Sequence, residues 1–353
     1  MLLAPVANSD MLDTTSTTTS TTTWQFGRSS GVLDRAAKPL EGLYACANST
    51  SVARRNPEVV VFRSAFLQNI SIDTMPLLTQ SQADDEEYVL VASLDNARNL
   101  SNILKAITFK DHAIFSATPN GLKVTVEDSK CMQANAFIQA EIFQEFTIKE
   151  DLVGFQVNLT VLLDCLNIFG GSTVPGVSTA LRMCYKGYGY PLTLFLEEGG
   201  VVTVCKINTQ EPEEPIDFEF CSSNVTNKVI LLSESLKEAF SELDMTSEVL
   251  QITMSPNQPY FRLSTFGNSG NAHYDYPKDS DMMELFKCTK TQTNRYKMSL
   301  LKPSTKALAL SCKVSVRTDS RGFLSLQYLV RNDDGQICFV EYYCCPDEEV
   351  EEE

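Results

Sequence analysis

Three carboxylates in the first half of the chain have residue types that suit metal-assisted chemistry. Asp95 lies at the start of an amphipathic segment, and Glu127 and Asp128 are adjacent in a run of alternating apolar and polar residues. A metal-dependent 3′–5′ DNA exonuclease needs several carboxylates around two metal ions about 4 Å apart. We keep this enzyme as the alternative function. A plainer explanation for Asp95 is that it caps a helix.

Other catalytic and metal-binding patterns are missing from the sequence. It contains no CxxC pair, no phosphate-binding glycine loop and no Ser/His/Asp arrangement, and His112 and His273 are its only histidines. The eleven cysteines are scattered, mostly within apolar runs, which is typical of reduced, buried thiols in an intracellular protein. We therefore expect no catalysis, no cofactor and no bound metal.

Basic side chains occur on the polar faces of expected helices, where they are placed to contact a nucleic-acid backbone. The helix expected over residues 94–107 carries Arg98 and Lys105 opposite an apolar stripe. A later helix, expected to begin near Lys302, carries Lys302 and Lys306 one turn apart. The alternative is that these are ordinary solvated helix faces.

The acidic balance of the chain argues against strong DNA binding by this chain alone. Its net charge is −16, and duplex affinity depends steeply on the number of phosphates that are neutralised. Lys237 shares its expected helix with Glu234, Glu238 and Glu242, and the helix expected over residues 158–169 has no lysine. We expect any DNA contact of the isolated chain to be weak.

The elements that must position these side chains occur in the same order twice. Strand and helix patterns over residues 88–207 precede a second series over residues 229–344. Leu94 and Leu232, at corresponding points, lie 138 positions apart. A duplicated unit of roughly 135–140 residues explains this spacing. Each unit has two helices and many alternating strands, which predicts an α+β fold with helices packed on antiparallel sheets.

The first 74 residues lack this periodicity. They include a Thr/Ser tract, Thr14–Thr23, and one isolated apolar patch, Val59–Phe62, that is expected to pair only transiently. Such a composition buries too little apolar surface to offset the entropy of ordering. The expected divisions are a disordered extension (1–74), a first domain (75–209), a connector (210–228), a second domain (229–346) and an acidic tail (347–353). No run is apolar and long enough for a membrane helix, and no secretory signal is expected.

Several runs of this duplicated chain resemble the sliding clamps related to proliferating cell nuclear antigen. These runs are Gly121–Ser129 with its Asp-Ser pair, Val157–Thr160 at a helix start, and Glu341–Pro346 before an acidic tail. Two others, Leu196–Val202 and Phe339–Glu349, look closest to the Rad-one subunits of the heterotrimeric DNA-damage checkpoint clamp. The resemblance covers Met75 to about Glu349.

The resemblance implies a sliding-clamp fold and a non-catalytic function in the nucleus. Three two-domain subunits would form a ring whose helices line a central channel, and double-stranded DNA would pass through it without base readout. The implied partners are two other clamp-like subunits, a clamp loader, and checkpoint and repair proteins. The DNA-facing residues would be Arg98, Lys105, Lys237, Lys302 and Lys306. A scaffold that never encircles DNA would share the fold.

The resemblance also implies two kinds of contact surface. Ring-closing edges are expected at Ile216, Phe218 and Phe220 in one half and at Tyr274 and Tyr276 in the other. A peptide-binding pocket beneath the connector would be lined by Glu127, Asp128, Phe323, Tyr343, Cys344, Cys345 and Pro346.

The pocket departs from the replicative clamps at Glu127, where those clamps carry an apolar methionine. A carboxylate is costly to bury against an apolar anchor. We therefore expect altered specificity, with aromatic or aliphatic anchors and a basic residue nearby. The alternative is that Tyr343 and Phe323 simply pack into the core of the second domain.

Overall fold

The structure, a computed structural model, describes residues 59–64, 87–170, 178–244, 246–267, 270–332 and 335–347. The first unit contains β2 (Leu90–Leu94), α1 (Ala97–Ala106), β3 (His112–Thr118), β4 (Gly121–Asp128), β5 (Met132–Gln139), β6 (Glu145–Ile148), β7 (Val153–Asn158), α2 (Leu159–Leu166), β8 (Ala180–Tyr185), β9 (Leu192–Glu198) and β10 (Val201–Ile207). The second unit contains β11 (Val225–Leu232), α3 (Ser233–Glu242), β12 (Val249–Met254), β13 (Phe261–Gly267), β14 (Gly270–Tyr276), β15 (Met283–Cys288), β16 (Gln292–Lys297), α4 (Met298–Leu301), α5 (Thr305–Leu310), β17 (Ser311–Asp319), β18 (Leu324–Arg331) and β19 (Ile337–Cys344). The two units therefore repeat one order of elements, and the predicted α+β duplication is confirmed.

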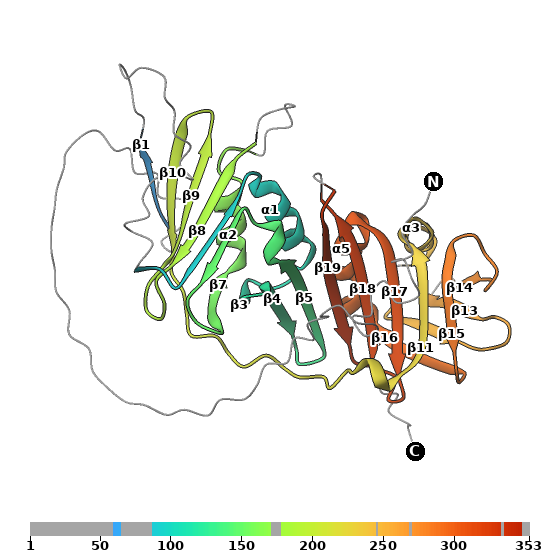
Figure 1. The fold of residues 1–353 in the computed structure, drawn as a ribbon. Helices are drawn as coiled ribbons and strands as arrows, with labels where there is room; N and C mark the ends of the chain where they lie inside the picture. The colour runs from blue at the N-terminus through green and yellow to red at the C-terminus, as the bar shows by residue number, and fades with distance from the viewer. Residues whose placement is uncertain are drawn as a thin grey trace.

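The two units form corresponding pairs of antiparallel sheets. The first unit has the strand orders β10-β9-β8-β2-β6 and β5-β4-β3-β7, and the second has β19-β18-β17-β11-β15 and β14-β13-β12-β16. β5 pairs with β19 and joins one sheet of each unit into a single sheet of nine strands. Figure 1 shows this junction in the middle of the molecule. Each strand of the first unit thus has a counterpart in the second.

The helices form one row across both units. α1 contacts α2 and α5, and α5 contacts α3. The apolar stripe of α1, which includes Leu100, Ile103 and Leu104, is buried against the sheet. Tyr342 of β19 donates a hydrogen bond to the Ala106 carbonyl of α1, which ties the row to the junction of the units. We call the opposite face of β17–β19 the outer face.

The last helical segment differs from the single helix expected to begin near residue 302. It begins four residues earlier with the single turn α4, passes through a 3-10 turn at Lys302–Ser304, and continues as α5. Pro303 lies in the 3-10 turn, where its missing N–H interrupts the regular α-helical hydrogen bonding. Lys302 and Lys306 therefore lie on two different pieces.

One further strand extends the first unit. β1 (Val59–Ser64) pairs antiparallel with β10, and Figure 1 shows it at the edge of that sheet. The disorder expected over residues 1–74 falls mostly outside the described residues, but Val59–Ser64 forms a strand instead, because β10 offers an edge. The connector between the units runs from residue 208 to 224, since β11 already begins at Val225. No helix in the described ranges is long and apolar enough to cross a membrane.

Candidate functional site

The connector packs on the outer face through aromatic side chains. Phe218 is only 8% exposed. Its ring centroid lies 5.6 Å from that of Phe323 and 6.1 Å from that of Tyr343, and Phe220 lies 5.5 Å from Tyr343. We call these four residues the connector cluster. Such tilted ring pairs contribute about 0.5–1.5 kcal/mol each beyond the burial of their area.

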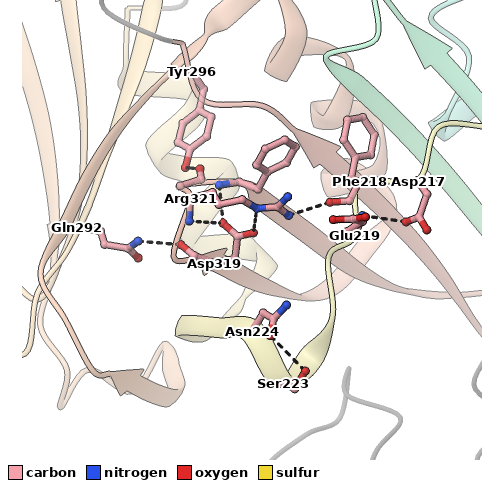
Figure 2. A network of polar contacts seen from close by, with 11 residues as sticks. Asp217, Phe218, Glu219, Ser223, Asn224, Gln292, Tyr296, Asp319 and Arg321 are labelled. Carbon is pink, nitrogen blue, oxygen red and sulfur yellow. Dashed lines mark hydrogen bonds and ion pairs between the residues drawn. The ribbon is translucent and has the colours of Figure 1, made fainter.

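Hydrogen bonds fasten the connector to both units. In the first unit, Glu127 accepts from the Ile216 amide at 2.8 Å, and Gln133 donates to the Ile216 carbonyl at 2.8 Å. In the second unit, the Arg321 guanidinium donates to the Phe218 carbonyl at 2.8 Å, as Figure 2 shows. The peptide groups beside the cluster therefore have protein partners, which is the condition for burying them.

The turn between β17 and β18 holds Arg321 in place. Asp319 is buried and accepts from the Arg321 side chain and backbone, both at 2.9 Å (Figure 2). The Arg321 guanidinium lies over the Phe323 ring, 4.6 Å from its centroid. Gly322 has φ +84°, and a Cβ there would lie 2.7 Å from the Asn294 side chain. The positive φ favours glycine at this turn, and any larger residue would also have to push the Asn294 side chain aside.

A buried ion pair lies beneath the connector. Arg317 on β17 contacts Glu341 on β19, and their side chains are 5% and 7% exposed. Ser325 donates to Glu341 at 2.9 Å, and the Arg317 guanidinium lies 5.4 Å from the centroid of the Phe220 ring. Burial, reinforced by the neighbouring Glu341 carboxylate, raises the pKa of Tyr343 well above its usual value. Tyr343 is therefore an uncharged aromatic surface for the connector.

The structure brings most of the predicted pocket residues together, but with changed roles. Phe323 and Tyr343 pack against the connector rather than into the core of the second domain. The predicted pocket position of Cys344 is wrong, because strand alternation turns its side chain into the core beside Tyr342. Glu127 bonds the chain's own connector, where we expected it to face a ligand.

The remaining predicted pocket residues lie at one margin of the connector cluster. Asp128 forms an ion pair of 2.8 Å with Lys110. Burial raises the pKa of Asp128, but hydrogen bonds from Lys110 and Ser129 outweigh it, so this pKa lies below its usual value. Cys345 and Pro346 are half-buried, and the Cys345 amide donates to the Cys131 carbonyl at 2.9 Å.

A hollow of about 550 Å³ opens next to the connector cluster. Its lining includes Asp217, Glu219, Phe220, Asp319 and Arg321. Sequence reasoning did not find Arg317, Arg321 or Glu341. Arg317 follows the alternation of polar and apolar residues along β17, and Glu341 is a single charged residue in the otherwise apolar run of β19, whereas Arg321 lies in the turn after β17 and has no such signal.

The two predicted subunit edges have different outcomes. Tyr274 and Tyr276 lie on β14, an edge strand of its sheet, although Tyr276 points inward and donates to the Ser235 carbonyl at 3.0 Å. Ile216, Phe218 and Phe220 lie on no strand, so the predicted edge there is wrong. Their segment is held by side chains of the outer face instead of presenting a ladder of free peptide groups.

Four of the five predicted DNA-facing cations lie on or next to α1 and α5, the two middle helices of the row. Lys105 is exposed on α1 and donates to Asn167 at 3.3 Å. Lys306 is exposed on the neighbouring α5 and donates to the Thr108 carbonyl at 2.7 Å. Lys302 is exposed just before α5, and Arg98 is half-buried on α1.

Lys237 lies apart from this group, on α3. It is paired with Glu234 at 3.3 Å and shares the helix with the exposed Glu238 and Glu242. Basic charge is therefore concentrated where α1 meets α5, and α3 adds little to it.

The three carboxylates of the exonuclease alternative do not form a site. The helix cap is Asn96, which accepts from the Arg98 amide at 3.1 Å, so the cap predicted at Asp95 is wrong. Glu127 and Asp128 are engaged with the connector and with Lys110. Among the residues that the structure describes, no group of three His, Cys, Asp or Glu side chains is arranged to hold a metal ion.

These observations define a class of protein. Two duplicated α+β units joined through a continuous sheet, with one row of helices, form the sliding-clamp fold. The family model described as "Repair protein Rad1/Rec1/Rad17" matches residues 89–330, and the chain belongs to this family. Membership places it among DNA-damage checkpoint and repair proteins.

Individual relatives agree with this assignment. The chain is 76% identical over 279 residues to the human cell cycle checkpoint protein RAD1, covering 79% of this chain and 99% of that protein. It is 31% identical over 261 residues to the Drosophila melanogaster DNA repair protein Rad1, covering 72% and 93%. The DNA repair exonuclease REC1 of Mycosarcoma maydis is 19% identical, covering 73% and 95%.

Proposed function

We propose that this chain is a non-catalytic subunit of a heterotrimeric nuclear ring that encircles DNA at damage and at stalled forks. The ring would be loaded by a clamp loader and would recruit checkpoint and repair proteins. The observation that carries this proposal is the junction between the two units. β5 and β19 pair across it, and their counterparts, β14 and β10, lie toward the outer ends of the other two sheets.

The junction supports assembly because the duplication supplies the same two surfaces again. In the proposed ring, β14 of one subunit would pair with the strand of the next subunit that corresponds to β10. Each contact between subunits would then repeat the pairing of β5 with β19 within the chain. Such head-to-tail contacts generate a ring when the rotation closes. An edge strand with free peptide groups also favours pairing with a neighbouring chain.

Charge supports different partners rather than three copies of this chain. Three copies would bring three times the net charge of −16 around an anionic duplex. The cations where α1 meets α5 offer a few phosphate contacts, and such contacts bind weakly unless other subunits add more. We therefore assign Arg98, Lys105, Lys302 and Lys306 to the channel, with Lys237 a minor contributor.

The outer face is the proposed docking surface for checkpoint and repair proteins. Because the connector already occupies it, a peptide anchor must replace Phe218 or Phe220 or bind beside them. The hollow next to the cluster, with Asp217 and Glu219, suits a ligand that carries a basic residue near its anchor. We therefore still expect aromatic or aliphatic anchors, because such an anchor must compete with Phe218 or Phe220 of the connector.

Retention on circular DNA tests the proposal. The chain would be purified with two co-expressed clamp-like subunits and loaded by a clamp loader onto a nicked plasmid. We expect the complex to stay bound in high salt and to be released when the plasmid is linearised, because a ring is held by topology. Equal retention on linear and circular DNA would contradict encirclement. Degradation of a labelled 3′ end in Mg²⁺ or Mn²⁺, abolished by Asp128→Ala, would support the exonuclease instead.

A further inference from the structure

β1 covers nearly the whole free side of β10. Six residue pairs join the two strands, from Val59 opposite Ile207 to Ser64 opposite Val202. β9 occupies the other side of β10. A strand has only two sides that can form a backbone ladder, so β10 in this state has no side left for another chain.

The duplication shows what β1 replaces. β10 is the counterpart of β19, and the corresponding side of β19 pairs with β5, again antiparallel and again over six residue pairs. β1 therefore occupies on β10 the place that β5 occupies on β19. In the ring proposed above, β14 of the neighbouring subunit would need that place.

We propose that residues 59–64 form an intramolecular cap on the ring-closing edge, which the neighbouring subunit must displace before it can bind. This inference rests on the proposed function. The unassembled chain would then be protected from pairing through β10, and ring assembly would be slower or weaker in the capped form. Protecting an otherwise open edge is a common need of soluble sheet proteins.

The position of β1 in the sequence makes the cap an effective competitor. It is tethered, with 25 residues between Ser64 and Leu90 of β2, so it acts at a high effective concentration. The apparent affinity of a partner equals its affinity for the open edge multiplied by the fraction of chains whose β10 edge is open. The family match begins at residue 89. The cap thus precedes the part that defines the family.

The first test measures hydrogen exchange of β10 amides in the chain alone. In a strand, the backbone N–H groups of successive residues point to opposite sides, so either Val60 or Val61 donates to β10. The double variant Val60→Pro with Val61→Pro removes both N–H groups and therefore removes the one that pairs with β10. We expect alternate amides of Val202–Ile207 to exchange at least about tenfold faster in this variant, because an uncovered edge is open to water. Val52→Pro, outside β1, is the matched control. Equal exchange in the double variant and the control would overturn the cap.

The second test measures association of the same full-length variants with two clamp-like subunits by titration. We expect the double proline variant to bind about tenfold more tightly than the control, in line with the open fraction. If the subunits bind both variants equally, the inference is wrong and the proposed assembly stands. If they bind neither variant, the proposed assembly itself fails, and the cap has no subunit to exclude.

Discussion

Truncating Phe218 to alanine is expected to release the connector from the outer face without unfolding the two units. Phe218 is 8% exposed and outside the main core, and its ring meets those of Phe323 and Tyr343. Burying a phenylalanine contributes about 1.5–3 kcal/mol, and each ring pair adds about 0.5–1.5 kcal/mol. Because the truncated connector keeps its hydrogen bonds and can settle partly, we expect a net loss of about 2–4 kcal/mol in the free energy of connector opening.

The amide of Ile216 reports this opening directly, because it donates to Glu127 and lies two residues from Phe218. A loss of 2–4 kcal/mol corresponds to roughly 30- to 700-fold faster hydrogen exchange when opening limits exchange. Tyr188→Ala is the matched control, since Tyr188 is 78% exposed. Unchanged exchange at Ile216 in Phe218→Ala, with the fold intact, would refute the role of the cluster in holding the connector.

Three further predictions concern the residues around the cluster. Glu341→Gln should lower the free energy of unfolding by about 3–5 kcal/mol in urea titrations, because it removes the carboxylate charge from a buried ion pair; a loss below 1 kcal/mol would contradict this. Gly322→Ala should destabilise the chain by about 1–3 kcal/mol through its positive φ and its contact with Asn294, and wild-type stability would show that the turn adapts. Lys110→Met should raise the pKa of Asp128 in an NMR titration. Since that pKa is lowered in the folded chain, the stabilisation is present above the ordinary pKa near 3.8 and is lost as pH falls below it; an unmoved pKa would exclude Lys110 as its cause.

The sequence allowed the repeated elements to be predicted because their signals are local. Asn158, expected at a helix start, caps α2 by accepting from the Val161 amide at 3.0 Å. The spacing of Leu94 and Leu232 was the evidence for the duplication. The structure places each of them at the end of a strand that precedes a helix. Propensity and periodicity act over a few residues, so they identify elements of this kind well.

The occupants of the functional surfaces could not be predicted in this way. Phe218 meets Phe323 across more than 100 positions of the chain, and β1 meets β10 across a similar separation. β1 begins as a short apolar run without alternation, whereas residues 216–220 alternate apolar and acidic side chains, a pattern that is typical of an edge strand. Their partners are chosen by which edge or face the folded units leave open, and that is a property of the tertiary structure. The resemblance predicted a pocket beneath the connector but gave no sign that Phe218 and Phe220 of the connector pack on Phe323 and Tyr343.

The mass of the assembled complex tests the central claim most directly. The chain, of 39.2 kDa, would be purified through a tag together with two co-expressed clamp-like subunits and weighed by native mass spectrometry. The account predicts one species that contains one copy of each of the three chains. A monomer of this chain alone, or a homotrimer at three times 39.2 kDa, would contradict heterotypic ring assembly.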